Sequence, residues 1–88
     1  MKFLIKYSSY TNVYFITLFD NIEKLGFIND SYTAKYLGLT KEKYQDILKS
    51  FNAIRPIYHI DCYFKNKEDA EKAIKVLEPY LIMAELTR

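Results

Sequence analysis

The scarcity of chain-breaking residues constrains this sequence more than any other feature. Only two glycines and two prolines occur among its 88 residues, and these residue types most often interrupt helices and strands. Half of the residues are apolar and 17% are aromatic, which is enough to build a folded core. We therefore expect one domain over residues 1–88, made of regular elements with little room for long flexible loops.

The N-terminal part has the composition of a β-hairpin. Residues 2–7 and 12–19 are rich in Phe, Ile, Tyr and Val, and a short polar stretch separates them. Such runs are typical of paired strands. A short helix over residues 21–25 is expected next, with Asp20 as its N-cap and Gly26 as its end.

Two further helices are predicted in the centre of the chain. The first runs from Asp30 or Ser31 to about Leu37 and stops at Gly38, because glycine tolerates the left-handed conformation that ends many helices. The second covers residues 41–51, and its apolar residues recur with helical spacing. Its N-cap is Thr40, and its apolar stripe consists of Tyr44, Ile47, Leu48 and Phe51.

The C-terminal third is predicted to be a strand–helix–strand unit. Residues 57–64 form a strand, residues 67–77 form a helix that begins after Asn66 and ends before Pro79, and residues 80–87 form a last strand. This last piece could instead prolong the helix beyond a kink. The fold class is therefore α+β in the order β-β-α-α-β-α-β, a four-stranded, mainly antiparallel sheet with helices packed on one face.

The predicted sheet has apolar residues on both faces, although a face that meets solvent should be mostly polar. An exposed apolar patch of this size usually marks an interaction site. It would bind another protein or a second copy of the chain, as a homodimer. A helix or a chain end that covers this face would explain the pattern as well. The candidate protein-binding residues are Tyr14, Ile16, Leu18, Leu81 and Met83.

Residues 31–50, SYTAKYLGLTKEKYQDILKS, resemble a helix-turn-helix unit. Ala34 is the small residue where two helices approach, and residues 37–39, Leu-Gly-Leu, fit the turn between them. Thr33 stands where an apolar residue is usual, and Tyr44 is bulky for its position. The resemblance implies DNA binding by the second helix, whereas the same residues also suit an ordinary helical hairpin packed on the sheet.

The charges on this second helix bear on the DNA-binding alternative. Its outward positions carry two lysines and two acids, Glu42 and Asp46, and DNA affinity depends largely on neutralising phosphates. Acids on that face would therefore weaken binding. The candidate DNA-binding residues are Thr40, Lys41, Gln45 and Lys49.

No group of residues predicts catalysis, a cofactor site or a metal site. His59 and Cys62 are the only histidine and cysteine, and three positions apart in a strand they would point to opposite faces. That geometry suits neither a nucleophile pair nor metal ligands. Gly26 and Gly38 are too far apart for a phosphate-binding loop. We therefore expect that the protein is not an enzyme; the alternative is an active site shared between the two copies of a dimer.

Charge and chain ends point to the cytoplasm. The net charge is only +2, which gives no strong nucleic-acid or membrane signal. A single cysteine excludes an internal disulfide. Lys2 and Lys6 interrupt the apolar N-terminus, so we expect no signal peptide, and no apolar run is long enough to span a membrane.

The segments LGLTKEKYQDIL and YFKNKEDAEKAIKVLEPYLI resemble, in a general way, short proteins of unassigned function from phages and mobile elements. The bias towards Lys, Tyr, Ile and Asn fits AT-rich coding of that kind. The resemblance implies a protein that binds a host or defence protein. The expected function is therefore a non-enzymatic, phage-type inhibitor or modulator, with a helix-turn-helix DNA-binding regulator as the alternative.

Overall fold

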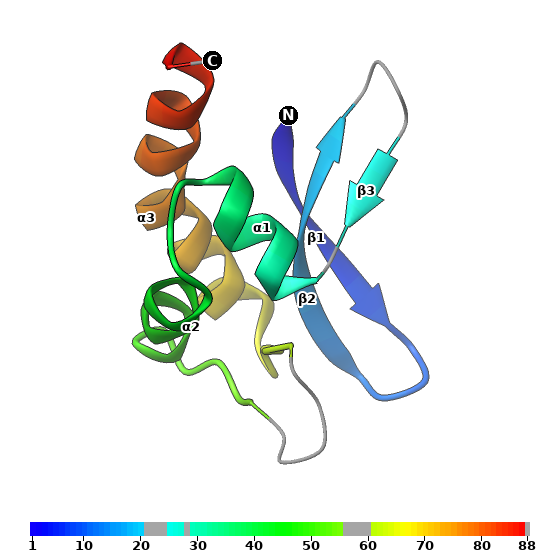
Figure 1. The fold of residues 1–88 in the computed structure, drawn as a ribbon. Coiled ribbons are helices and arrows are strands. Elements are labelled where there is room, and N and C mark those ends of the chain that lie inside the picture. Colours follow the sequence, from blue (N-terminus) through cyan, green and yellow to red (C-terminus); the bar gives the residue numbers. More distant parts are fainter. Residues whose placement is uncertain (21–24, 28, 56–60, 88) are drawn as a thin grey trace.

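The computed structural model describes residues 1–20, 25–27, 29–55 and 61–87. It confirms an α+β fold, with helices gathered on one side of a small antiparallel sheet (Figure 1). The order of elements differs from the predicted one, because the described residues form β1-β2-β3-α1-α2-α3. The predicted four-stranded sheet in the order β-β-α-α-β-α-β is therefore wrong.

The sheet is built on a long hairpin. Strands β1 (Lys2–Ser8) and β2 (Val13–Asp20) pair antiparallel, from Lys2 opposite Phe19 to Ser8 opposite Val13. This confirms the hairpin that the two β-rich runs predict. The short strand β3 (Leu25–Phe27) adds to the other edge of β2.

Strand β3 corrects the predicted end of the helix expected over residues 21–25, namely Leu25 and the stop at Gly26. Residues 21–24 lie outside the described part of the chain, but Leu25 pairs with Asp20 and Gly26 pairs with Phe19. Gly26 is therefore a strand residue and does not end a helix. Propensity signals over five residues are weak, and pairing with a neighbouring strand overrides them.

The side chains of the hairpin alternate between the two faces of the sheet. Phe3, Ile16 and Leu18 are buried on the face that meets the helices, whereas Leu4 and Lys6 are exposed. The inner residues join those of the helices in one core. Its buried apolar members are Phe3, Ile16, Leu18, Ala34, Leu37, Tyr44, Leu48, Cys62, Phe64, Ala70, Ala73, Leu77 and Leu81.

Helices α1 (Asp30–Tyr36) and α2 (Lys41–Lys49) form the predicted helical hairpin. Helix α1 begins at Asp30, as predicted, and its N-cap is Asn29. Its side chain accepts hydrogen bonds from two backbone N–H groups of the first turn, which a helix cannot satisfy internally. Gly38 follows α1 with a φ of 74°, as the predicted left-handed stop requires.

Helix α3 (Lys67–Leu86) begins where the predicted helix over residues 67–77 begins and continues to Leu86. The predicted strand over residues 80–87 is therefore wrong, and the alternative of a prolonged helix is confirmed. Pro79 lies inside it, although proline removes a helical hydrogen bond. Leu77 and Leu81, on either side of Pro79, are both buried in the core. Packing of this apolar side outweighs the lost bond, because tertiary contacts supply most helical stability in proteins.

The predicted strand over residues 57–64 is reduced to two single bridges in the described part of the chain. Residues 57–60 lie outside that part. Tyr63 pairs with Ile54, and Phe64 pairs with Tyr14 on β2. Phe64 and Tyr14 exchange two backbone hydrogen bonds of 2.8 Å each, which fasten this segment to the hairpin. The chain turns into α3 directly afterwards, so the pairing ends.

A buried carboxylate holds the helices to this bridging segment. Oδ2 of Asp30 accepts hydrogen bonds of 2.8 Å from the side-chain amide of Gln45 on α2 and from the backbone N–H of Cys62. The backbone N–H of Asp30 donates in turn to Oδ1 of Asp61, at 2.9 Å. Asp30 and Gln45 are both buried. We call Asp30, Gln45, Asp61 and Cys62 the carboxylate clasp.

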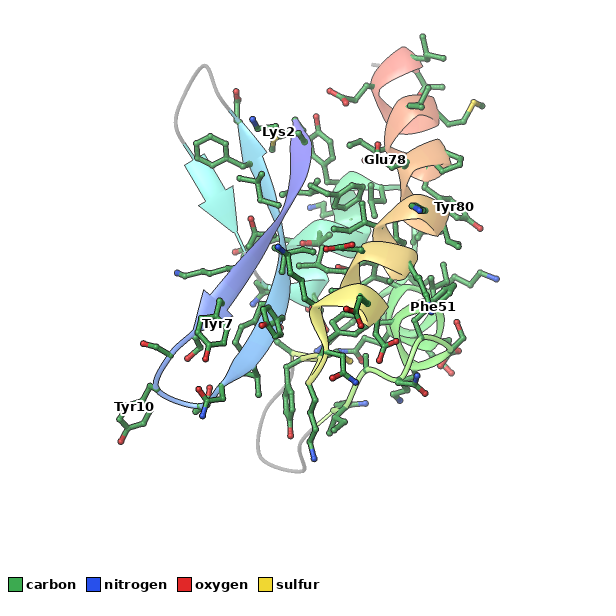
Figure 2. All side chains as sticks on the ribbon, turned by 180° about the vertical axis from the view of Figure 1, so that it is seen from behind. Lys2, Tyr7, Tyr10, Phe51, Glu78 and Tyr80 are labelled. Carbon is green, nitrogen blue, oxygen red and sulfur yellow. The ribbon has the colours of Figure 1, made fainter. Side chains whose placement is uncertain are left out.

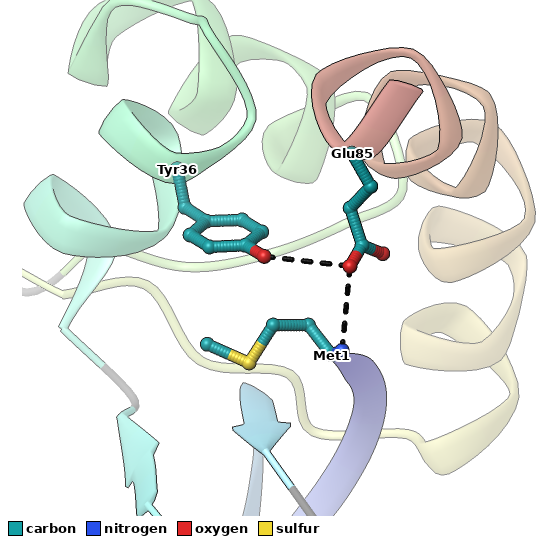
Figure 3. Close-up of polar contacts among 3 residues, drawn as sticks. All are labelled: Met1, Tyr36 and Glu85. Atoms are coloured by element: carbon teal, nitrogen blue, oxygen red, sulfur yellow. Dashed lines mark hydrogen bonds and ion pairs between the residues drawn. The ribbon is translucent and has the colours of Figure 1, made fainter. Parts of the chain in front are cut away.

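A second polar cluster ties the end of α3 to the rest of the fold (Figure 3). Oε2 of Glu85 accepts a hydrogen bond of 3.4 Å from the Tyr36 hydroxyl and forms a 3.5 Å ion pair with the amino group of Met1. The Glu85 side chain is partly exposed, so this pair contributes little. It nevertheless brings β1, α1 and α3 together at one point.

Replacing Asp30 tests the carboxylate clasp. Asp30→Ala removes the acceptor of two buried donors and should lower the free energy of unfolding by about 2–3 kcal/mol. Asp30→Asn keeps an acceptor oxygen and should cost less. Burial raises the pKa of the Asp30 carboxyl above its ordinary value of 3.8, so the folded state binds this proton more tightly than the unfolded state.

This group therefore contributes most to stability at acid pH, and the contribution falls as pH rises from 3.8 through the raised pKa. The stability of the wild type relative to Asp30→Asn should consequently decrease over that interval. Urea unfolding at several pH values measures both effects. Equal stability of Asp30→Ala and the wild type would contradict the role of the clasp.

Candidate functional site

The turn of the β1–β2 hairpin is held by hydrogen bonds among its own residues. Asn12 adopts a φ of 56°, a conformation that Asn tolerates better than most residues. Its backbone N–H donates to the carbonyl of Ser8 at 2.7 Å, and its side chain accepts from the Tyr7 hydroxyl at 2.6 Å. The Thr11 hydroxyl donates to the Ser8 hydroxyl at 3.0 Å. The turn is thus fixed locally.

Three tyrosines gather at this end of the hairpin, and we call them the tyrosine tip: Tyr7, Tyr10 and Tyr14. The rings of Tyr7 and Tyr14 face each other across the two strands with their centroids 5.0 Å apart. Tyr10 stands at the turn with 96% of its surface exposed, and it projects away from the rest of the molecule (Figure 2). A tyrosine this exposed is available for contact with another molecule, and tyrosine is enriched at protein interfaces.

The predicted protein-binding residues do not form one surface. Tyr14 belongs to the tyrosine tip, but Ile16 and Leu18 lie buried under the helices. Leu81 is buried on the core side of α3, and Met83 is exposed on the same helix. The side chains along β2 alternate between the two faces of the sheet, as expected. The helices cover the face that carries Ile16 and Leu18, which was predicted to be open.

Tyr7 and Tyr10 are the tip residues that sequence analysis missed. The available signal was a polar turn, Ser-Ser-Tyr-Thr, with an aromatic residue in its middle. A turn residue has no pattern of burial to follow, so only the folded hairpin shows that Tyr10 has nothing to pack against.

Helix α3 presents a second exposed surface. Its C-terminal half is apolar on the side that faces away from the core, where Met83 is 61% exposed, Leu86 is 75% exposed and Ile82 is 56% exposed. Val76 and Pro79 are exposed on the preceding turns. We call Val76, Pro79, Met83 and Leu86 the free seam of α3. A shallow hollow of about 260 Å³ adjoins it, between Met83 and the end of α1.

Helix α2 borders another hollow, of about 400 Å³. Side chains of α2 and Arg55 line it, namely Lys41, Glu42, Gln45, Asp46, Lys49 and Arg55. Arg55 adds a third cation that sequence analysis did not include. The two acids lie among the three cations, so the hollow has a mixed electrostatic character.

Two of the four candidate DNA-binding residues already have structural roles. Gln45 borders the hollow but is buried, and its side-chain amide donates to Asp30 in the carboxylate clasp. The Thr40 hydroxyl accepts from the backbone N–H of Lys43 at 3.0 Å and caps α2, as predicted. Lys41 and Lys49 remain available at the hollow.

The titratable groups of the core are chemically quiet. Burial, with a smaller contribution from the charge of Asp30, raises the pKa of the Cys62 thiol to about 12. Burial also raises the pKa of Tyr44 well above 10. The Cys62 thiol is therefore protonated at neutral pH, and a protonated thiol is a poor nucleophile. His59, which the sequence analysis considered together with Cys62, lies outside the described residues.

The described ranges show neither a metal-binding cluster nor a membrane-spanning helix. Residues 1–20, 25–27, 29–55 and 61–87 contain no cluster of three or more His, Cys, Asp or Glu side chains placed to hold a metal ion. Within the same ranges, no helix combines the length and the apolar character needed to cross a membrane.

Comparison of the chain with protein-family models, with curated proteins and with solved structures gives no significant match.

Proposed function

We propose that this chain is a non-enzymatic binding protein that docks its tyrosine tip on another protein. The observation that carries the proposal is the 96% exposure of Tyr10 beside the tilted ring contact of Tyr7 and Tyr14. Tyrosine is among the residues that contribute most to protein interfaces, because it offers a large apolar ring and a hydroxyl at once.

The rigidity of the turn supports the same proposal. A flexible loop loses conformational freedom when it binds, and that loss weakens affinity. Here the Tyr7–Asn12 and Ser8–Asn12 hydrogen bonds hold the turn before any partner arrives. Tyrosine itself has few rotatable bonds, so ordering the ring of Tyr10 costs little more.

The class of partner follows from the sequence resemblance to small phage and mobile-element proteins. On that basis we propose a host or defence protein as the target and inhibition or modulation as the outcome, in the cytoplasm. The buried, unpaired thiol of Cys62 is compatible with a reducing compartment.

Removal of the Tyr10 ring tests this function. Tagged wild type and Tyr10→Ala would be used to capture partners from bacterial lysate treated with nuclease, with quantification by mass spectrometry. An aromatic hot spot contributes about 2 kcal/mol or more, so recovery of the specific partner should fall at least tenfold. Tyr32→Ala is the matched control, since Tyr32 is an exposed tyrosine on α1, away from the tip.

Unchanged recovery with Tyr10→Ala would remove the tyrosine tip as the binding surface. Loss of recovery with Tyr32→Ala as well would indicate a general defect of the protein and not a local contact.

A DNA-binding regulator is the second candidate, and one observation favours it. The cations Lys41, Lys49 and Arg55 line one hollow beside α2, and within the described part of the chain none of them forms an ion pair. Unpaired cations on a helical hairpin could contact phosphates. The acids Glu42 and Asp46 in the same hollow act against this.

Salt-dependent binding to duplex DNA tests the second candidate. Lys41→Ala and Lys49→Ala should each weaken binding and reduce the slope of log affinity against log salt by about one. Lys75→Ala, on the exposed side of α3, is the control that should change neither quantity. Fluorescence anisotropy with a labelled duplex measures both. Affinity that does not respond to Lys41 or Lys49 would exclude this role.

A further inference from the structure

The outer edge of the sheet indicates what kind of segment the target offers to this chain. We infer that an extended, acidic segment of the target adds to the free edge of β1 as a further strand. The inference rests on the proposed function, since Tyr7 belongs both to β1 and to the tyrosine tip, and it names the chemistry of the partner.

Strand β1 lies at one edge of the sheet, because the strands follow one another in the order β1-β2-β3. Along an antiparallel strand, successive residues direct their backbone N–H and C=O groups to opposite edges. Tyr14 directs both groups to Phe64, away from β1, so the odd-numbered residues of β2 are those that bond to β1. Their partners in β1 are the even-numbered residues. The odd-numbered Phe3, Ile5 and Tyr7 therefore direct their groups to the free edge.

The accessible part of this edge is the C-terminal half of β1. Phe3 is buried and Ile5 is partly buried, whereas Tyr7 is half exposed. Figure 1 shows this half of β1 leading away from the three helices. No described residue bonds to the backbone of Ile5 or Tyr7 on that side. An open row of backbone donors and acceptors is the surface with which an added strand pairs.

The charge of the hairpin identifies the added strand as acidic. Of the 13 basic and 11 acidic side chains of the chain, residues 1–19 contain two lysines and no acid. The remaining residues are balanced, with 11 side chains of each sign. The net charge of +2 therefore lies entirely in residues 1–19, and a partner that docks there gains from negative charge.

Both lysines stand beside the free edge. Lys2 and Lys6 are exposed, and they share with Leu4 the face of β1 that points away from the helices. A strand paired with β1 would place three alternate residues opposite these side chains. Opposite charges across a strand pair are favourable. The expected pattern in the partner is therefore an acid, an apolar residue and an acid at alternate positions.

A second copy of β1 is a poorer occupant of this edge. It would bring the lysines of two hairpins together, although residues 1–19 contain no acid to balance them, and like charges do not favour strand pairing. Lysine on an edge strand is a common protection against such self-pairing. An acidic strand converts the same two lysines into attractive contacts.

An antiparallel direction is expected for the added strand, since antiparallel pairs are slightly more stable per residue than parallel ones. In this direction, the partner residues opposite Ile5 and Tyr7 exchange backbone hydrogen bonds with β1. The acids opposite Lys2 and Lys6 direct their own N–H groups to the far side of the added strand.

Fluorescence anisotropy with a synthetic strand tests the inference. The probe is a labelled peptide with blocked ends, Thr-Glu-Thr-Val-Thr-Glu-Thr, titrated at low salt with the full chain to about 1 mM. We expect saturable binding, whereas the same peptide with lysine at both Glu positions should not bind. An acidic peptide that fails to bind up to that concentration would overturn the inference.

N-methylation of the peptide distinguishes strand pairing from charge attraction alone. Methyl groups on the N–H of the first two threonines, which lie opposite Tyr7 and Ile5, remove two hydrogen bonds to β1. They should weaken binding about tenfold. Methyl groups on the valine and the second Glu, whose N–H groups point away from β1, are the matched control and should change affinity little. Equal affinity of the two methylated peptides would overturn the assignment of a strand.

Lys6→Glu tests the contribution of charge. It should raise the Kd of the acidic peptide about tenfold or more, because it turns an attraction into a repulsion. Lys72→Glu changes the net charge equally at an exposed position of α3 and should leave the Kd unchanged. Lys6 is exposed, so circular dichroism should show unchanged folding. An equal effect of the two substitutions would contradict the acidic contact.

Tyr10→Ala separates this inference from the function of the tip. Tyr10 lies outside β1, so Tyr10→Ala should bind the acidic peptide as the wild type does. Peptide binding together with unchanged capture of partners by Tyr10→Ala would reject the tip and keep the added strand. Loss of capture by Tyr10→Ala, together with no peptide binding by the wild type, would reject the added strand and keep the tip.

Discussion

The buried carboxylate of Asp30 is the interaction on which the arrangement of the helices depends. It stands at the first residue of α1 and accepts hydrogen bonds from α2, through Gln45, and from the backbone of Cys62. Burying a carboxylate is unfavourable by itself, which is why burial raises its pKa. The cost is offset only when its hydrogen-bond partners are in place, so the clasp selects one arrangement of three segments over its alternatives.

The positions of the tyrosine tip and of the free seam of α3 follow from this arrangement of the helices and the hairpin. The clasp holds α1 and α2 together, and the exchanged backbone bonds of Phe64 with Tyr14 attach the following segment to the hairpin. Helix α3 then packs Leu77 and Leu81 inward, which directs its opposite side to solvent. The tyrosine tip at one end and the free seam at the other are therefore what a small core leaves uncovered, and the tip supplies the proposed contact with a target.

Local signals in the sequence predicted the hairpin, both central helices, the Thr40 cap and the stop at Gly38, because each depends on residues close in sequence. The course of α3 through Pro79 was not predictable in the same way, since its stability comes from packing against β1 and β2. The alternating residues after Pro79 fit a strand equally well. Nor could the pattern along β2 show which face the helices cover, and that choice moved Ile16 and Leu18 from the candidate site to the core.

An NMR titration of the Asp30 carboxyl in the folded protein, with the backbone amide of Cys62 followed in parallel, tests most directly whether this buried carboxylate holds the helices. We expect the pKa of Asp30 to lie above its ordinary value of 3.8. The Cys62 amide resonance should shift with the same midpoint, because its N–H donates to that carboxylate. A Cys62 amide that does not respond to this titration would show that its N–H does not donate to the Asp30 carboxylate and that the clasp does not hold the helices.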